Sequence, residues 1–224
     1  MKIGRDFFLE PTLKVAKKLL GKYIFRKYKR KLIIGKIVET EAYIGPKDKA
    51  SHAYCQKEQS INEKKKIIYK NFSRIKNYIQ DPEIFLNRIL KLKNAKVTNR
   101  NLVEYLKGGH VYIYLIYGLY YQFNITTHKE GYPQCVLIRS LEPISGNFKV
   151  YPNGPAKLCN FLKIDSSFWG HDLIKSEIFY LENGENFSEK EIIKTKRIGI
   201  EYAKEDSQLP WRFYIKGNKW VSKL

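Results

Sequence analysis

The sequence predicts one domain of the α+β class, residues 1–224, and three observations support this expectation. The chain is 43% hydrophobic, which is enough to bury one sizeable core and argues against disorder throughout. Segments rich in β-branched and aromatic residues recur from the N-terminal third to the end of the chain. Segments with apolar residues at helical spacing lie between them. We therefore expect a β-sheet with peripheral helices.

The N-terminal part predicts a short helix and then a β-hairpin. Apolar residues recur at helical spacing after Pro11-Thr12, and Gly21 stands where a left-handed C-terminal cap would lie. Residues 23–28 and 32–43 have strand composition and are separated by the basic turn 29–31. The second strand ends in Glu-Thr-Glu-Ala-Tyr, before the chain-breaking pair Gly45-Pro46.

The remaining regular elements follow the same signals. Three further strands are predicted from segments dense in Tyr, Ile and Val: residues 110–117, 120–127 and 134–141. Pro155 opens a short predicted helix over 156–162, because proline at a first helical position gives up only an N–H that would be unpaired anyway. A last strand is expected over 211–216.

The composition of residues 56–97 differs from that of the rest of the chain and indicates a basic, helical insertion within the domain. Lys and Arg number 11 against four acids there, and nine apolar residues lie at roughly helical spacing. One interpretation is an additional DNA-facing arm. The other is a surface excursion whose charged face is merely solvated.

The charge of the whole chain points to a polyanionic partner. Lys and Arg number 42 against 22 acids, for a formal net charge of +20. Such a surplus favours nucleic acid through counterion release. A charge kept for solubility, or a codon bias toward lysine, would give the same composition.

Cysteine spacing and the N-terminus exclude other classes of protein. Cys55, Cys135 and Cys159 form no CxxC pair and have no histidine at ligand spacing, so we expect no disulfide framework and no metal. The first residues lack the apolar core of a signal peptide, and no run is apolar enough to span a membrane. We expect a soluble, intracellular protein that does not bind membranes.

Two glutamates in the second strand are candidates for activating water. A carboxylate can orient and deprotonate a water molecule, as hydrolysis of a glycosidic bond requires. Glu39 and Glu41 share one face of a strand, because side chains alternate with period two, so the pattern does not choose between them. A solvated strand-end residue is the ordinary alternative.

The tyrosine-rich segment 112–121 is a candidate platform for nucleobases. Period two places Tyr112 and Tyr114 on one face and Tyr117 on the other, and Gly118 permits a sharp turn after them. Several tyrosines on one strand can also belong to a hydrophobic core in which the rings are buried and the hydroxyl groups reach solvent. Beside a basic surface, base stacking at about 1–3 kcal/mol per base becomes the stronger interpretation, and a cationic alkylated base would stack better still.

Several motifs in this order resemble a known family, the alkyladenine DNA glycosylases, also called 3-methyladenine DNA glycosylases of the mammalian type. The resemblance begins at Phe7-Phe8, resumes after the insertion at Thr98, and continues nearly to Val221-Ser222. Its motifs are the segments 38–43, 48–52, 112–124, 135–143 and 153–159. The family implies a curved antiparallel sheet. It also implies an enzyme that flips alkylated or deaminated purines out of duplex DNA and hydrolyses the N-glycosidic bond in base excision repair.

The resemblance further implies particular substrates, products and surroundings. The purines would be 3-methyladenine, 7-methylguanine, hypoxanthine and ethenoadenine, with faster excision of the cationic ones. The product would be an intact abasic site, because the family lacks an amine nucleophile for a lyase reaction. The resemblance implies no organic cofactor. Double-stranded DNA would be the partner of a monomeric enzyme, in the nucleus of a eukaryote or the cytoplasm of a bacterium.

The resemblance also implies roles for individual residues. Glu41, rather than Glu39, would be the general base, and Arg139 would help to hold the water. Tyr117 would wedge into the gap left in the duplex. The base pocket would include Tyr43 and Tyr114 as a sandwich, His52 at the base edge or sugar-phosphate, Asn124 as a screen against the guanine amino group, and Ala50. Arg100 and Lys157 would contact the DNA backbone.

Two departures from the family pattern concern loops. The family joins its Ala-Ser-His-Ala-Tyr stretch to a Thr-Pro-Arg-Asn motif after a few residues, whereas about forty intervene here and the motif reads Thr-Asn-Arg-Asn at 98–101. The loop beside the pocket is therefore expected to be rebuilt. Ala156 stands where the family commonly has glycine, a change that would cause strain only at a positive φ.

Two other functions would use the same basic, aromatic surface. A non-catalytic binding module for damaged DNA or RNA would need no carboxylate, so the presence of Glu41 and Arg139 argues against it. An RNA-processing enzyme would bind single-stranded RNA better than duplex DNA.

Overall fold

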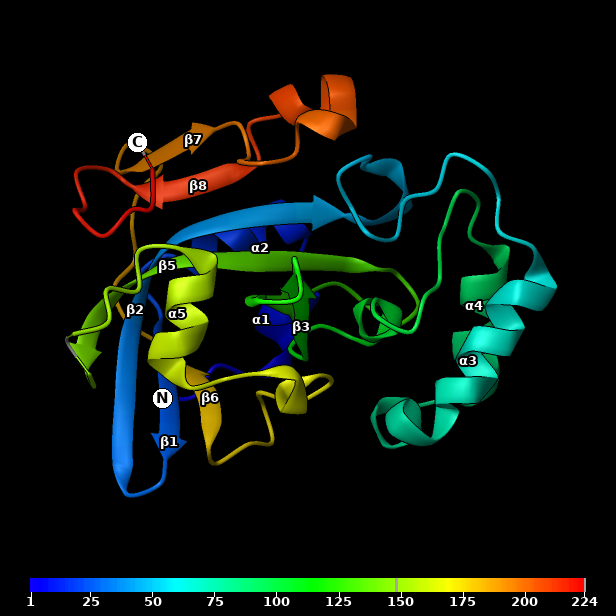
Figure 1. Cartoon of the computed structure of the whole chain (residues 1–224), viewed down its shortest axis with the longest axis horizontal. Helices are drawn as coiled ribbons and strands as arrows, with labels where there is room; N and C mark the ends of the chain where they lie inside the picture. The colour runs from blue at the N-terminus through cyan, green and yellow to red at the C-terminus, as the bar shows by residue number, and fades with distance from the viewer. Residues whose placement is uncertain (148, 224) are drawn as a thin grey trace.

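A curved antiparallel sheet organises the computed structural model, which describes residues 1–147 and 149–223 (Figure 1). The main path of the eight-stranded sheet runs β3-β4-β5-β2-β1-β6, and β8 joins it through β2 while β7 pairs with β8. The strands are β1 (Tyr23–Tyr28), β2 (Lys31–Ile44), β3 (Val111–Ile116), β4 (Tyr120–Thr126), β5 (Gln134–Ser145), β6 (Phe179–Glu182), β7 (Ile192–Thr195) and β8 (Arg212–Ile215). The predicted single α+β domain is confirmed.

Helices surround this sheet and form a separate group at one end (Figure 1). They are α1 (Arg5–Leu9), α2 (Thr12–Lys18), α3 (Ile61–Ile75), α4 (Pro82–Lys91) and α5 (Pro155–Leu162). The 3₁₀ segments include the single turn η3 (Leu102–Tyr105) and η5 (Glu201–Gln208), which contains a kink at Lys204. All the strands and helices expected from the sequence are present. The sequence interpretation missed α1, β6 and β7, each only four or five residues long.

Strand β2 is the backbone of the fold because it changes partners along its length. Residues 31–36 pair with β1 and residues 39–41 pair with β8, while β5 pairs with β2 from Ile34 to Ile44. Register irregularities fall at Glu39, where the partner on one side has changed from β1 to β8. Bulges bend and twist a strand, and Figure 1 shows β2 turning sharply in this region. The second half of β2 is thereby covered on both faces, which buries Glu39 and Glu41 completely.

The main core lies between the sheet and the helices α2 and α5. Its buried side chains include Val15 and Leu19 around α2 and Leu158 and Leu162 of α5. Ala156 lies in the first turn of α5 and is not among the residues with positive φ, so it replaces glycine without strain.

The predicted helical segment 56–97 is confirmed as helical, and it leaves and rejoins the domain at one point. Tyr54 and Ala95 form a bridge there. A capping box of Ser60 and Glu63 starts α3. Apolar side chains of α3 and α4 form a second core with η3, Tyr112 and Cys135. The segment therefore does not simply extend into solvent, because its apolar side chains pack against η3 and β3.

A buried ion pair fixes the loop that follows β2. Arg197 Nη1 and Nη2 donate to Asp48 Oδ2 and Oδ1 at 2.6 and 2.8 Å, and both side chains are fully buried. Arg197 Nη1 also donates to the carbonyl of Ala42, and its guanidinium lies 4.8 Å from the Tyr43 ring centroid. Asp48 accepts from the backbone N–H of Ala50. The pair therefore ties residues 197–198 to the end of β2.

No helix of the described residues is long and apolar enough to cross a membrane.

Replacing Phe85 by Ala should lower the free energy of unfolding by about 3–5 kcal/mol, because the ring is 1% exposed in the second core. Ile84→Ala is the control in the same helix, since Ile84 is 46% exposed and should cost about 0.5 kcal/mol or less. Denaturant unfolding monitored by circular dichroism compares the two. Equal effects would show that α4 is not packed as described.

Asp48→Asn should destabilise the protein by about 3–5 kcal/mol, because it leaves the buried Arg197 without its counter-ion. The neighbouring Lys49→Gln breaks a solvent-exposed pair with Glu205 and should leave the unfolding midpoint nearly unchanged. Urea titration of both variants measures the difference. A small effect of Asp48→Asn would contradict a stabilising role of the Asp48–Arg197 ion pair.

Candidate active site

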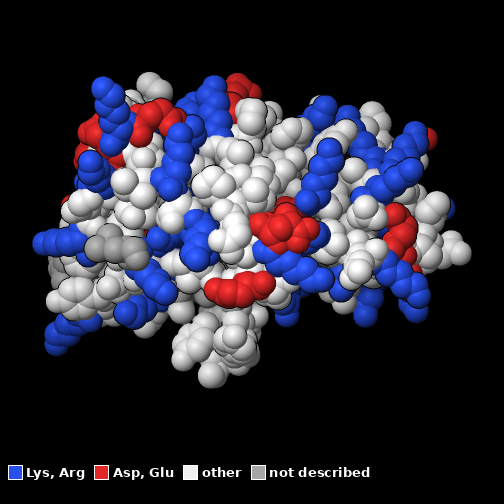
Figure 2. All heavy atoms as spheres, turned by 90° about the horizontal axis from the view of Figure 1, so that it is seen from above, with Lys and Arg blue, Asp and Glu red and all other residues white. Residues whose placement is uncertain are grey.

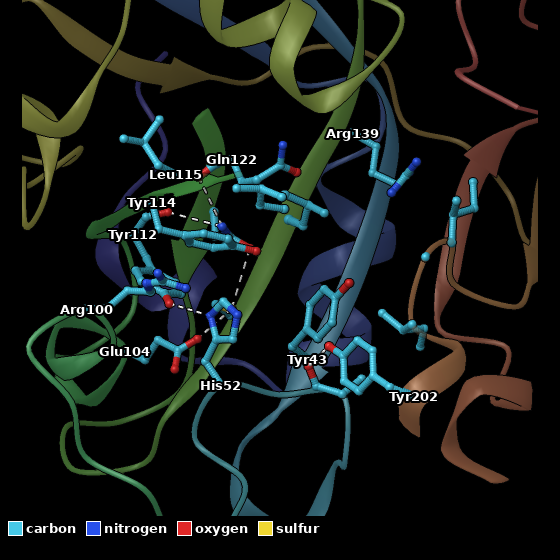
Figure 3. A pocket seen from close by; sticks show the side chains of 18 of the residues that line it. Tyr43, His52, Arg100, Glu104, Tyr112, Tyr114, Leu115, Gln122, Arg139 and Tyr202 are labelled. Atoms are coloured by element: carbon cyan, nitrogen blue, oxygen red, sulfur yellow. Dashed lines mark hydrogen bonds between the residues drawn. The ribbon is translucent and has the colours of Figure 1, made fainter. Parts of the chain in front are cut away.

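The predicted pocket residues converge on one hollow of about 380 Å³ (Figure 3). Strands β2 to β5 supply part of its wall, and three loops complete it. It is lined by Tyr43, Ala50, His52, Arg100, Glu104, Tyr112, Tyr114, Leu115, Ile116, Tyr117, Gln122, Asn124, Cys135, Leu137, Arg139, Ile198, Gly199, Ile200 and Tyr202. Lys157 is the one predicted site residue that lies well away from it, in α5. No group of described residues could hold a metal ion.

Aromatic side chains form two facing walls (Figure 3). His52, Tyr112 and Tyr114 lie on one side, and Tyr43 and Tyr202 lie on the other. His52 Nδ1 is 2.6 Å from the Tyr112 hydroxyl, and its ring packs edge-on against Tyr114 with centroids 4.6 Å apart. A flat ring entering the pocket would therefore meet aromatic surface on both sides.

His52 is held as a neutral imidazole. Burial lowers its pKa to about 4, with a further contribution from the positive charges of Arg100 and Lys96. The Asn101 side chain donates to the carbonyl of His52 at 3.0 Å, so the rebuilt 98–101 motif still fixes this loop. At neutral pH the ring can therefore serve as a hydrogen-bonding group without adding charge to the pocket.

The contacts of the two strand glutamates differ. Glu39 accepts from Arg139 Nε at 3.0 Å, Arg212 Nη1 at 2.7 Å, and the Ser222 N–H and hydroxyl at 2.7 and 3.0 Å. Three of these donors reach Oε1 and one reaches Oε2, so both oxygens of Glu39 are engaged. Glu39 does not line the pocket. Its role is structural: it joins β2 to β5, β8 and the C-terminal segment.

Glu41 lies directly behind the pocket wall. It is fully buried, and its three contacts are all with residues that line the pocket. Its Oε1 accepts from the Ile198 N–H at 2.8 Å and lies 3.2 Å from Arg139 Nη1. Its Oε2 accepts from the Tyr43 hydroxyl at 2.9 Å. These contacts leave one acceptor position on Oε2.

Arg139 connects the two carboxylates and also lines the pocket. Burial alone would lower its pKa, but the charges of Glu41 and Glu39 outweigh burial and raise the pKa. The guanidinium is therefore permanently charged and held in position by two anions.

Asn124 and Ala50 line the hollow as well, at 1% and 3% exposure. The Asn124 amide nitrogen donates to the carbonyls of Tyr112 and Gln122 at 3.2 and 3.4 Å, so the side chain is fixed against the β3–β4 pair. The pocket floor is therefore rigid and closely packed.

Tyr117 stands at the exposed tip of the β3–β4 hairpin. Its side chain is 89% exposed, and both Tyr117 and Gly118 have positive φ, at 53° and 69°. A non-glycine residue in that region is uncommon and is typical of functional positions. The tip separates the pocket from a second hollow, which is lined by Tyr120, Lys157 and neighbouring residues.

Several lining residues were not predicted from the sequence. Glu104, Tyr202 and Ile198 belong to this group, together with Arg197 behind the wall. Glu104 carried a weak signal, as a single acid within the apolar run 102–106. The segment 197–202 carried none, because it reaches the pocket only through the tertiary fold.

Comparison with known proteins assigns the chain to a family. The family model of methylpurine-DNA glycosylases matches residues 6–81 and 91–219. The gap between these two matched ranges, residues 82–90, is shorter than the predicted insertion and lies within α4. Helix α3 therefore falls inside the matched region.

Bacterial relatives that match over nearly their full length support the same family assignment. Proteins carrying the name "Putative 3-methyladenine DNA glycosylase" are 40% identical in Borreliella burgdorferi strain ZS7, over 99% of this chain and 100% of the relative. The relative of the same name in Clostridium perfringens is 38% identical over 100% of this chain and 100% of the relative. The one in Clostridioides difficile is 37% identical over 94% of this chain and 98% of the relative. The chain therefore belongs to the methylpurine-DNA glycosylase family.

Proposed function

We propose that this protein is a monofunctional DNA glycosylase that removes 3-methyladenine and related purines from duplex DNA by hydrolysis. The observation that carries the proposal is the placement of Glu41, with one free acceptor position, behind an aromatic pocket that Arg139 also lines. Its relatives' names and its family support the same activity.

In the proposed mechanism, Glu41 Oε2 accepts a hydrogen bond from the attacking water, which Arg139 helps to position. As the bond to the purine breaks, the sugar becomes oxocarbenium-like, and Glu41 takes the proton of the water that adds to it. The purine leaves with the bonding electrons. No lysine is among the described residues lining the pocket, so no amine stands ready for a lyase reaction. The product is then an intact abasic site.

The extruded purine would lie between the two aromatic walls, with Tyr43 and Tyr114 on opposite faces and His52 at its edge. Asn124 would screen purines by clashing with the guanine amino group, because its side chain lines the pocket and is fixed by two hydrogen bonds. Tyr117 would fill the gap in the duplex, since an exposed aromatic ring on a rigid tip can replace the stacking of the lost base.

Duplex DNA would cross the hairpin tip and cover both hollows. Arg100 lines the pocket on one side of the tip, and Lys157 lines the hollow on the other. Figure 2 shows Lys and Arg spread widely over one face with groups of acids among them, and the net charge of +20 suits a polyanion. The helical segment 56–97 remains a predicted DNA-facing arm. Lys64 contributes little to it, since it is buried and donates to the Leu92 carbonyl.

The relatives named above are bacterial, so we expect a monomeric enzyme that acts in a bacterial cytoplasm.

Glu41→Gln should lower the single-turnover rate of excision by about 100-fold or more, because it removes the general base. The substrate is a duplex with one ethenoadenine, and alkaline cleavage of the abasic product measures the rate. Binding to the same duplex is the control and should persist. Wild-type protein that binds the lesion but never releases the base would instead indicate a damage-binding module, and stronger binding to single-stranded RNA would indicate an RNA enzyme.

The double variant Arg100→Gln/Lys157→Gln should flatten the salt dependence of duplex binding. Each lost phosphate contact removes about 0.9 from the slope of log K against log salt concentration, or up to about 1.8 for two. Lys175→Gln/Lys190→Gln is the matched control, because these exposed lysines line neither hollow. Fluorescence anisotropy at several salt concentrations gives both slopes. An equal fall in the two variants would contradict this placement of the DNA.

A further inference from the structure

A second carboxyl group faces the pocket from the wall opposite Glu41. Glu104 belongs to η3, lines the hollow and is 2% exposed. Figure 3 shows its carboxyl group directed into the pocket beside His52, across from Tyr43 and Tyr202. Glu41 lies behind the Tyr43 side. The two carboxyl groups therefore lie on different sides of the pocket, Glu104 in its wall and Glu41 behind the wall.

One oxygen of Glu104 has no partner within the described protein. Its Oε1 accepts from the Cys135 thiol at 3.4 Å. Its Oε2 is buried and makes no hydrogen bond among the described residues. Buried polar atoms in native proteins are almost always paired, and an unpaired one is costly. An unpaired oxygen on a residue that lines a ligand pocket is therefore best explained as a contact for the ligand.

The surroundings of Glu104 keep it neutral at pH 7. Burial raises its pKa to about 8, the thiol of Cys135 lowers the pKa, and the charge of Asp48 raises it. The other titratable groups facing it are Tyr112 and Tyr114 of β3, which remain neutral because burial raises their pKa values.

The remaining neighbours add little charge. His52 beside it is a neutral imidazole, and Tyr105 of its own turn has a pKa raised by burial. Strand β4 contributes the uncharged amides of Gln122 and Asn124. Arg100 is the nearest cation lining this side and is exposed.

We propose that Glu104 is a specificity-determining residue, which contacts the purine edge through Oε2 and distinguishes cationic alkylated purines from neutral ones. The inference rests on the proposed glycosylase function and extends it. The residue can act in two forms. As a carboxylic acid it donates its proton to a nitrogen or oxygen acceptor on a neutral purine. As a carboxylate it pairs with a cationic purine.

The two forms make purine binding depend on pH in opposite directions. A cationic purine favours the carboxylate, so its binding releases the Glu104 proton to solvent. A neutral purine favours the acid and keeps the proton. A group with pKa about 8 is about one-tenth ionised at pH 7 and about nine-tenths ionised at pH 9. Raising the pH should therefore help excision of cationic purines and hinder excision of neutral ones.

The test compares wild type with Glu104→Gln on 3-methyladenine, which is cationic in DNA, and on neutral ethenoadenine. Single-turnover efficiency is measured from pH 6.5 to 9, and the wild-type value is divided by the variant value at each pH. Any pH dependence that the two proteins share, including ionisation of the lesion, cancels in this quotient. Between pH 7 and 9 the quotient should rise about tenfold for 3-methyladenine and fall about tenfold for ethenoadenine.

Two controls separate recognition from folding. Glu130→Gln changes another buried glutamate whose pKa burial raises, but which does not line the pocket, and its quotients should stay flat. Binding to a duplex with a tetrahydrofuran abasic site, which has no base, should be equal for wild type and Glu104→Gln. If Glu104→Gln does not fold, Glu104→Met provides the quotient, and the opposite pH slopes of wild type on the two lesions remain measurable.

The outcomes are distinct. Quotients that move in opposite directions support the inference. Quotients that are flat, or that move together for both lesions, overturn it while leaving the glycosylase function intact. A wild-type protein that excises neither lesion overturns the proposed function and this inference together.

Discussion

The buried charge cluster on β2, β5 and β8 is the constraint on which the site depends. Arg139 lies between Glu39 and Glu41, and Arg212 reaches Glu39 from the other side. Removing such charges from water costs several kcal/mol per ion, so the cluster is tolerable only when its partners are fixed. Glu39 supplies that fixation, because donors from Arg139, Arg212 and Ser222 hold its two oxygens. Arg139 is held in place as a result, and Glu41 lies behind the pocket wall with all three of its contacts made to lining residues.

The curvature of the sheet makes this arrangement reachable. Where β2 exchanges β1 for β8, its irregular register bends the strand, so that residues buried under β8 also approach the pocket. The buried Asp48–Arg197 pair then closes residues 197–198 over the end of the strand, where the Ile198 N–H contacts Glu41. The helical segment supports the opposite wall through η3. The pocket is therefore enclosed by elements that are each stabilised outside it.

The sequence predicted the elements well but could not resolve the two strand glutamates. The composition and turn signals were strong for β1 to β5, α2 and α5, whereas β6 and β7 are four residues long and gave no periodic signal. Period two placed Glu39 and Glu41 on one face and left their roles open. Their difference arises from Ser222, Arg212 and Ile198, which lie more than 150 residues away. Contacts between such distant segments cannot be read from local pattern.

Two carboxyl groups in one pocket need different surroundings if they are to do different work. Glu41 is surrounded by an arginine, a backbone N–H and a tyrosine hydroxyl, all of which stabilise a carboxylate. Glu104 has only a weakly donating thiol and lies among apolar and aromatic side chains, which favour the neutral acid. The strand therefore supplies a carboxyl group surrounded by donors, and the 3₁₀ turn supplies one whose pKa is raised by burial. A purine between them would present its sugar bond to the first and its edge to the second, so that hydrolysis and recognition use separate carboxyl groups.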